Sequence, residues 1–348
     1  MRRYDVDWLR ICALGLLILY HVVVGFQPWA AALLFIQNDQ TLETLWILMG
    51  MLNVWRIPIL FVVSGMGVCF AMEKRDWKAL LKDRTLRILT PFIFGFFFIC
   101  PISTYIAIKY YGGEAGYFPN PGHLWFLANI FLYVAMLLPL LLYLKSRPNH
   151  IVLGFLSRFF RYPGGLYVLA IPVVVEALLV QPEVFSTYVG TSHGFWLGLV
   201  CFSTGFLFVS LKDFSWPAAE RLRGAALALA FFLYLARLLA FGLEGPIALT
   251  ALESVSWILA ILGYGSAYLN QPSQTLAYFS KAVYPVYIVH FPVQCFFSYY
   301  LMPLPLPSVV KLLTLLATTL GASLLLYELV IKRLKWIRPL FGMKFQTS

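Results

Sequence analysis

Two titratable side chains lie eleven residues apart in an otherwise uncharged stretch near the start of the chain. Arg10 and His21 flank ten residues, mostly Leu, Ile and Ala, in "DWLRICALGLLILYH". In an α-helix eleven residues are almost three turns and about 16 Å, so both side chains would share one face. A neutral imidazole at that depth can act as a general base or a proton shuttle. A core histidine that is hydrogen-bonded to a neighbouring helix is the alternative interpretation.

Further ionisable side chains lie inside apolar stretches, where each costs about 2.5–3.5 kcal/mol on insertion scales and is therefore a candidate functional group. Glu253, in "ALESVSWI", can orient a histidine or pair with Arg237 or Arg56. His290, in "YPVYIVH", lies about 12 Å from the start of its apolar stretch. The depth of His290 in its stretch is comparable to that of His21.

Three other short segments contain candidate binding residues. Arg84 and Arg87, in "DRTLR", would face the same way on a helix, and paired guanidinium groups suit phosphate recognition, although membrane topology alone also explains basic residues there. Arg56, in "WRIPILFVVSG", is either a substrate contact or an arginine whose charged end reaches the membrane surface. "GHLWFL" supplies His123, which can reach a polar acceptor, and Trp125, which an aromatic belt would also explain.

Signatures of other chemistries are absent from the sequence. There is no GxxxxGK[ST], HExxH or GxSxG motif, so the energy for a reaction would come from an activated substrate. The five cysteines form no CxxC pair and lie in apolar stretches, which indicates small core residues and no metal site. The roles of Glu176, Arg237 and Glu328 stay open, although Glu328 suits a salt bridge at the membrane surface.

These residues belong to a chain with the composition of a membrane protein. Of its 348 residues, 61% are hydrophobic and 12% are charged, against roughly 25% charged residues in soluble domains. Long apolar runs without two-residue alternation predict helices and exclude a barrel. We therefore predict an all-α integral membrane protein, with about ten transmembrane helices in one bundle and a single polytopic domain over residues 1–348. The predicted spans are 8–29, 45–72, 86–108, 124–144, 165–181, 194–211, 224–242, 247–269, 282–301 and 308–331.

The basic residues predict the orientation of the bundle. Segments between the predicted spans are alternately rich and poor in Lys and Arg, and only four of the 26 basic residues fall outside the rich set. Because basic loops stay in the cytoplasm, both termini are expected there. The net charge of +11 is distributed in this topological pattern, which argues against nucleic acid as a partner.

The quoted stretches resemble the membrane acyltransferase-3 family, whose members transfer acyl groups from acyl-coenzyme A to sugars. The resemblance rests on Asp7, Arg10, His21, "RIPILFVVSG", the Arg84–Arg87 pair, "HLWFL" and "YPVYIVH", in this order. "ESVSWILAILG" and "LYEL" are similar to the branch that succinylates osmoregulated periplasmic glucans. The resemblance implies an O-acyltransferase in a bacterial cytoplasmic (inner) membrane, with the lipid bilayer, acyl-CoA and a carbohydrate acceptor as partners and without a metal.

The resemblance also implies a mechanism. Acetyl-CoA or succinyl-CoA would bind from the cytoplasm, with its phosphates on Arg84 and Arg87 and with Arg10 as the third candidate for cofactor binding. His21 would act as general base on a hydroxyl of an extracytoplasmic or lipid-linked carbohydrate. The remaining candidates are Glu253 and His290 for catalysis, and Asp7, Arg56, His123 and Trp125 for substrate binding.

Two other classes of protein stay open from the sequence. A transporter or flippase of a sugar-containing substrate would also contain buried ionisable groups, although the two-fold internal repeat common in transporters is absent. A scaffold subunit of a polysaccharide synthase would leave the buried charges without a role. The sequence names neither the acyl group nor the acceptor, and it leaves the oligomeric state open, a homo-oligomer included.

Overall fold

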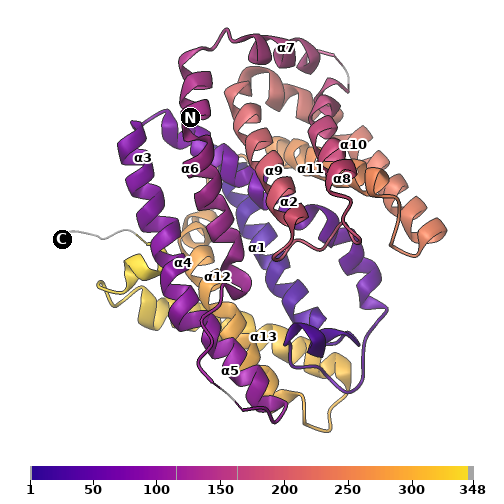
Figure 1. Cartoon of the computed structure of the whole chain (residues 1–348), viewed down its shortest axis with the longest axis vertical. Coiled ribbons are helices and arrows are strands. Elements are labelled where there is room, and N and C mark those ends of the chain that lie inside the picture. The colour runs from indigo at the N-terminus through magenta and orange to yellow at the C-terminus, as the bar shows by residue number, and fades with distance from the viewer. Residues whose placement is uncertain (1, 115, 163, 344–348) are drawn as a thin grey trace. The chain divides into compact units, whose positions relative to one another are not determined.

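The computed structural model describes residues 2–114, 116–162 and 164–343, and these residues form helices joined by turns and loops, without a strand (Figure 1). Within this part of the chain, eight helical stretches are long and apolar enough to cross a membrane. This finding confirms the predicted class, an all-α integral membrane protein. The stretches are α1 (Tyr4–Val24), α2 (Leu45–Met72), Trp77–Tyr110, Gly122–Ser146 with α6 (Trp125–Ser146), α9 (Ser192–Ser210), α10 (Lys212–Phe241), α11 (Ile247–Tyr268) and Ser308–Ile331 with α13 (Ser308–Leu326).

Two of the ten predicted spans are not among the eight. In the range 165–181, the 3₁₀ helix η5 (Gly165–Leu169) leads into α8 (Ala170–Val180), and together they are shorter than a full span. In the range 282–301, α12 (Gln274–Leu301) is long, but polar side chains such as His290 and Gln294 reduce its apolar character. The count of ten spans therefore stays a prediction.

The first helix ends five residues before the predicted limit. Gly25, Phe26 and Gln27 donate backbone hydrogen bonds to the residues three positions before them, so the last turn tightens and α1 stops at Val24. His21 therefore lies in the last turn of α1. Its main-chain carbonyl is one of the groups that a helix end leaves without an intrahelical donor.

The third membrane stretch contains two π-helical turns. α3 (Trp77–Arg84), η2 (Thr85–Leu89), α4 (Thr90–Phe94), η3 (Gly95–Ile99) and α5 (Cys100–Tyr110) follow one another without a break. Arg84 directly precedes the first π turn and Arg87 lies within it. Such turns occur frequently at functional sites.

The chain forms two compact units that alternate along the sequence. The first unit contains Met1–Ala13, Gly50–Lys82 and Leu132–Leu276, and the second contains Leu14–Met49, Asp83–Phe131 and Ala277–Ser348. In the second unit, α12 and α13 pack against the second half of α1. The core residues there include Ile18, Val22, Val286 and Met302.

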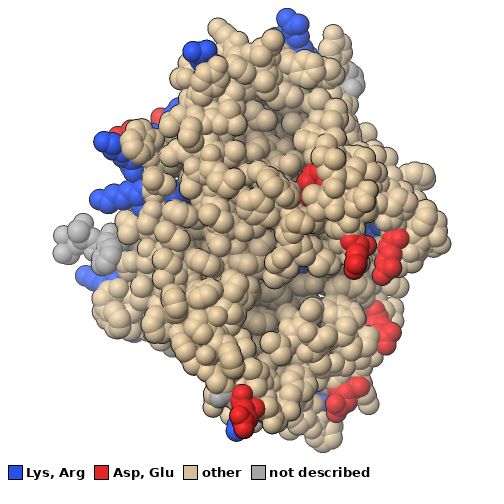
Figure 2. Space-filling view, viewed as in Figure 1, with Lys and Arg blue, Asp and Glu red and all other residues tan. Residues whose placement is uncertain are grey.

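The surface visible in Figure 2 consists mainly of residues that are neither acidic nor basic. Lys, Arg, Asp and Glu side chains appear there only in a few places. Large hydrophobic side chains on this kind of surface suit contact with lipid. Examples that are more than half exposed are Leu179, Phe232 and Leu239.

Two glycines bring α2 and α9 into backbone contact inside the first unit. A Cβ atom on Gly65 would collide with the carbonyl oxygen of Phe202, and a Cβ atom on Gly205 would collide with that of Val62. Small residues at such crossings let membrane helices approach closely. The sequence pattern "VVSG" in α2 thus has a packing role.

We expect Gly65→Ala to destabilise the protein by about 1–3 kcal/mol, because the neighbour to be displaced is backbone and cannot rotate away. Gly224→Ala is the matched control, since a Cβ atom there meets nothing within 4 Å. Thermal unfolding of the purified protein in detergent checks both. Equal unfolding temperatures for the two variants would contradict the close α2–α9 crossing.

Candidate active site

Three histidines from different helical elements lie together in the second unit. Nδ1 of His21, on α1, is 2.9 Å from Nε2 of His290, on α12, and the two rings are inclined by only 4°. His123, in η4 (Gly122–Leu124), stands across them, with its ring centre 4.9 Å from that of His290 and 6.5 Å from that of His21. The structure thus brings together three of the residues that the sequence singled out.

A main-chain carbonyl determines which nitrogen of each ring carries a proton. Nδ1 of His290 is 2.6 Å from the carbonyl oxygen of Tyr287, and a carbonyl only accepts, so this nitrogen is the donor. In a neutral ring, Nε2 of His290 then accepts the hydrogen bond from Nδ1 of His21. The lone pair of His21 is therefore on Nε2, the nitrogen that can accept a proton.

A proline explains why His123 is held in place. Pro292 has no N–H, so the carbonyl of Ile288, four residues earlier, lacks its usual helical partner. Nε2 of His123 is 3.1 Å from this oxygen and 3.1 Å from that of Tyr287, and it is therefore a donor. The Tyr287 hydroxyl in turn donates to the carbonyl of His123 at 2.6 Å.

The same bonds leave an acceptor on the His123 ring. Because Nε2 donates, Nδ1 of the neutral ring carries a lone pair. This atom is buried and has no hydrogen-bond partner among the described residues. A buried acceptor is costly when it stays unpaired, so the site suits a ligand that supplies a donor, such as a hydroxyl group.

Other side chains surround His21. Gln294, one turn beyond His290, donates from Nε2 to the carbonyl of His21 at 2.8 Å and so caps the end of α1. Phe35 and Phe291 pack against the imidazole, with ring centres 5.8 Å and 5.2 Å away. In the sequence, the position of Gln294 four residues after His290 is the feature that could have marked it as part of the site. Its role becomes visible only in the structure, where α12 packs against α1.

Two of the three candidate cofactor-binding arginines, Arg84 and Arg87, lie in the same unit as the histidines, whereas Arg10 belongs to the first unit. Nε of Arg87 is 3.1 Å from a carboxylate oxygen of Asp83, and the Arg87 side chain is 37% exposed. Gly342, with a φ of 69°, packs where a Cβ atom would meet the ring of Tyr284 and the carbonyl of Arg87. Among the described residues, no group of three or more His, Cys, Asp or Glu side chains is arranged to hold a metal ion.

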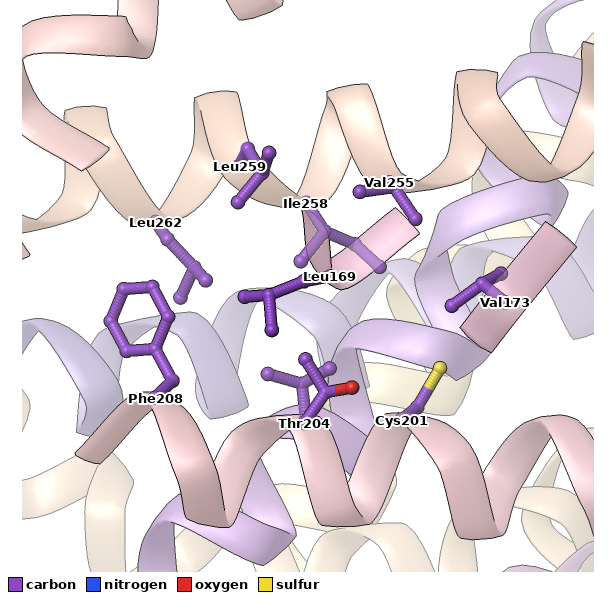
Figure 3. A pocket seen from close by; sticks show the side chains of 10 residues that line it. Leu169, Val173, Cys201, Thr204, Phe208, Val255, Ile258, Leu259 and Leu262 are labelled. Atoms are coloured by element: carbon purple, nitrogen blue, oxygen red, sulfur yellow. The ribbon is translucent and has the colours of Figure 1, made fainter. Parts of the chain in front are cut away.

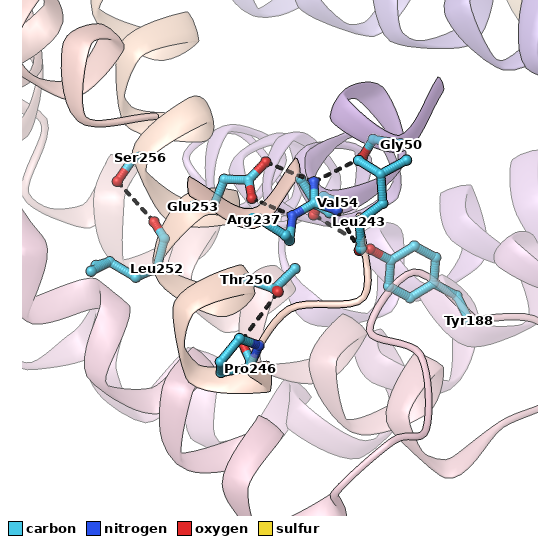
Figure 4. Close-up of polar contacts among 10 residues, drawn as sticks. All are labelled: Gly50, Val54, Tyr188, Arg237, Leu243, Pro246, Thr250, Leu252, Glu253 and Ser256. Carbon is cyan, nitrogen blue, oxygen red and sulfur yellow. Dashed lines mark hydrogen bonds and ion pairs between the residues drawn. The ribbon is translucent and has the colours of Figure 1, made fainter. Parts of the chain in front are cut away.

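Glu253 forms an ion pair inside the first unit (Figure 4). Its two carboxylate oxygens accept from Nε and Nη2 of Arg237 at 2.6 Å and 2.9 Å. Arg237 also donates to the carbonyls of Leu243 and Gly50, and both charged side chains are almost fully buried. This is the pairing that the sequence offered as an alternative, and the catalytic role of Glu253 stays a prediction without support from this geometry.

The other predicted substrate or cofactor residues of the first unit have near neighbours in it. Arg56 is buried and donates to the side chain of Asn53 at 2.9 Å. Asp7 lies 3.6 Å from Arg10, one turn along α1, and also accepts from Arg2. Trp125, the remaining candidate for substrate binding, belongs instead to the second unit, where it is the first residue of α6. Their binding roles stay predictions.

The structure supplies a partner for Glu176, which the sequence left unassigned. Its carboxylate lies 3.0 Å from Nδ1 of His193, and Nε2 of His193 donates to the carbonyl of Phe185 at 2.9 Å. All of these groups belong to the first unit and are buried. With both ring nitrogens engaged, His193 has the bonding of a structural residue.

An apolar cavity in the first unit has a volume of about 20 Å³. Side chains of α8, α9 and α11 point into it, among them Val173, Cys201, Thr204 and Ile258 (Figure 3). A cavity of this size has room for about one water molecule but lacks the polar partners that would hold it. It is therefore a packing void and no substrate site.

Fold and site together define an integral membrane protein with a buried histidine cluster. A family model described as an acyltransferase domain matches residues 3–328, nearly the whole chain, so the protein belongs to the acyltransferase-3 family. The resemblance drawn from the sequence is thereby confirmed. The protein is an acyltransferase by family.

The chain is similar to curated bacterial proteins named glucans biosynthesis protein C. Those of Salmonella heidelberg (strain SL476), Salmonella agona (strain SL483) and Salmonella typhi are each 22% identical to it over 377 residues. The similarity covers 99% of this chain and 95% of each relative. No solved structure matches the chain.

We expect Arg237→Met to destabilise the protein by about 3–5 kcal/mol, because it leaves the Glu253 carboxylate buried without its partner. The double variant Arg237→Met with Glu253→Leu removes both charges and is expected to recover most of the loss. Thermal unfolding in detergent measures the stability of each variant, and an acyl-transfer assay tests whether the Arg237–Glu253 pair is needed for activity. A stable double variant that is inactive would show that the Arg237–Glu253 pair is needed for acyl transfer.

Proposed function

We propose that this acyltransferase moves an acyl group from acyl-CoA to a hydroxyl of a carbohydrate, with His21 as the general base. The observation that carries the proposal is the hydrogen-bond chain from the Tyr287 carbonyl through His290 to His21, which leaves the lone pair on Nε2 of His21. Family membership supports acyl transfer, and the name of the relatives supports a glucan as the acceptor.

The reaction follows from this tautomer. Nε2 of His21 takes the proton of the acceptor hydroxyl while the hydroxyl oxygen attacks the thioester carbon. The new C–O bond forms, the C–S bond breaks, and the CoA thiolate receives the proton from His21. His290 accepts a hydrogen bond from Nδ1 throughout and stabilises the charged ring, which makes it a positioning residue.

His123 supplies the second contact in the proposal. Its buried Nδ1 acceptor would bind another hydroxyl of the sugar and so fix the orientation of the attacking oxygen. Phe35 and Phe291 pack around His21 and exclude water that would compete with the acceptor. Asp7, Arg56 and Trp125 remain further candidates for contacts with the substrates.

The donor would enter from the cytoplasm. Arg84 and Arg87, at the first π turn, would bind the phosphates of CoA by charge-assisted hydrogen bonds. Arg10, in the first unit, remains a separate candidate for cofactor binding. The proposal includes ten spans, cytoplasmic termini and a bacterial inner membrane, as the distribution of Lys and Arg predicts. The donor acyl group is acetyl or succinyl.

Replacement of His21 by alanine is expected to lower acyl transfer by about 10²–10⁴-fold, the usual contribution of a general base. The assay uses inverted membrane vesicles with labelled acetyl-CoA and succinyl-CoA, at matched expression. His150→Ala is the matched control, because His150 caps α7 (Ile151–Phe160) outside the cluster. Equal transfer by His21→Ala and wild type would refute the base, and no transfer by wild type would favour a transporter.

Two variants of His290 test whether its hydrogen bond to His21, and not merely the volume of its side chain, is needed for acyl transfer. His290→Gln retains a side-chain acceptor for Nδ1–H of His21, whereas His290→Leu has none. We therefore expect His290→Leu to lower the turnover number by about 10²-fold and His290→Gln to restore part of the loss. The KM for acyl-CoA should be the same in both, and a rise in KM alone would argue against the relay.

Loss of the proposed contact between the arginines and acyl-CoA should change the KM for acyl-CoA. Arg84→Ala and Arg87→Ala are each expected to raise the KM for acyl-CoA by about tenfold, since a hydrogen bond to a charged group contributes on the order of 1.5–3 kcal/mol. The turnover number should change little. Arg333→Ala removes an arginine from another basic segment and is the control. An unchanged KM in both variants would exclude this pair as the phosphate site.

A further inference from the structure

Three aromatic side chains connect the reacting histidine to the loop that follows α1. We propose that Tyr20, Trp46 and Trp29, here called the aromatic ladder, bind successive sugar rings of an oligosaccharide acceptor whose terminal hydroxyl reaches His21. The inference rests on the proposed function, because it assigns the acceptor side of the same site.

The rings form an unbroken series within the second unit. The ring centre of Tyr20 is 5.8 Å from that of His21 and 5.7 Å from that of Trp46. The Trp46 ring is in turn 4.7 Å from that of Trp29. Successive rings are inclined to one another by 52°, 44° and 79°, so they face different directions, and all four side chains are partly exposed.

The neighbouring loop supplies polar groups for sugar hydroxyls. Asp39, Gln40 and Glu43 are exposed, and the carbonyl of Glu43 accepts from the backbone N–H of Trp46 at 2.8 Å. Carboxylates and amides accept and donate the hydrogen bonds that hydroxyl groups need. The exposed carboxylate of Glu43, one turn before Trp46, would be costly in contact with acyl chains, which favours a sugar over a lipid as the occupant.

The chain itself fixes the position of the ladder. Tyr20 precedes His21 in the last turn of α1, Trp29 begins the turn into η1 (Ala30–Leu33), and Trp46 lies in the first turn of α2. The loop between them is tied back by Asn38, whose N–H donates to the carbonyl of Gly25 at 2.8 Å. Tyr20 and Trp46 are therefore held by helices and Trp29 by a loop of defined conformation, which lowers the entropy cost of binding.

Binding without turnover tests the ladder. Isothermal titration calorimetry would use the purified full-length His21→Ala protein in detergent and linear β-glucan oligosaccharides of increasing length. We expect affinity to rise with length until the ladder is filled. A Trp46→Ala change in this background should weaken binding of the longer oligosaccharides by about tenfold, whereas Trp46→Phe should retain most of it.

Trp196→Ala is the control, since Trp196 is 47% exposed on α9 of the other unit. Binding that is independent of length, or equal in the Trp46→Ala and Trp196→Ala variants, would overturn the ladder. Acyl transfer by wild type is measured separately. Transfer without oligosaccharide binding would refute the ladder alone, and binding without transfer would refute the proposed function alone.

Discussion

Pro292 removes one backbone N–H from α12, and the arrangement of the histidines depends on this loss. The carbonyl of Ile288 is left to accept from His123, while the preceding carbonyl, that of Tyr287, accepts from His290. In an apolar environment an unsatisfied carbonyl costs several kcal/mol, so these contacts are strongly favoured. The missing N–H of Pro292 thereby favours the tautomer of His123, whereas the Tyr287 carbonyl fixes that of His290 and, through it, that of His21.

Buried polar side chains in the two units differ in how completely they are hydrogen-bonded. In the first unit, Arg237 of α10 pairs with both carboxylate oxygens of Glu253 of α11, and His193 of α9 pairs with one carboxylate oxygen of Glu176 of α8. The other oxygen of Glu176 is buried without a hydrogen-bond partner among the described residues. In the second unit, the cluster keeps an acceptor on His123 that the described residues leave unpaired. The fully paired Arg237–Glu253 ion pair stabilises the fold, whereas the unpaired acceptor of His123, beside two further imidazoles, is suited to a ligand.

The sequence predicted the parts of this site better than their pairing. Helical periodicity placed Arg10 and His21 on one helix, and the depth of His290 in its own stretch marked it as a partner. The early end of α1 was missed because tight turns after Val24 replace the helix although the residues stay apolar. Glu176 with His193 and Gln294 with His21 were missed because contacts between helices are not encoded in spacing along one chain. The Glu253–Arg237 pair was foreseen only as one of several alternatives.

The mutual distances of the three imidazoles limit how much charge the cluster can hold. Ring centres 4.9 Å and 5.2 Å apart would place two imidazolium ions in strong repulsion within a poorly screening environment. The cluster therefore stores one proton at a time. In the proposed reaction, a second acceptor hydroxyl would therefore be deprotonated only after His21 has passed the first proton to the leaving thiolate.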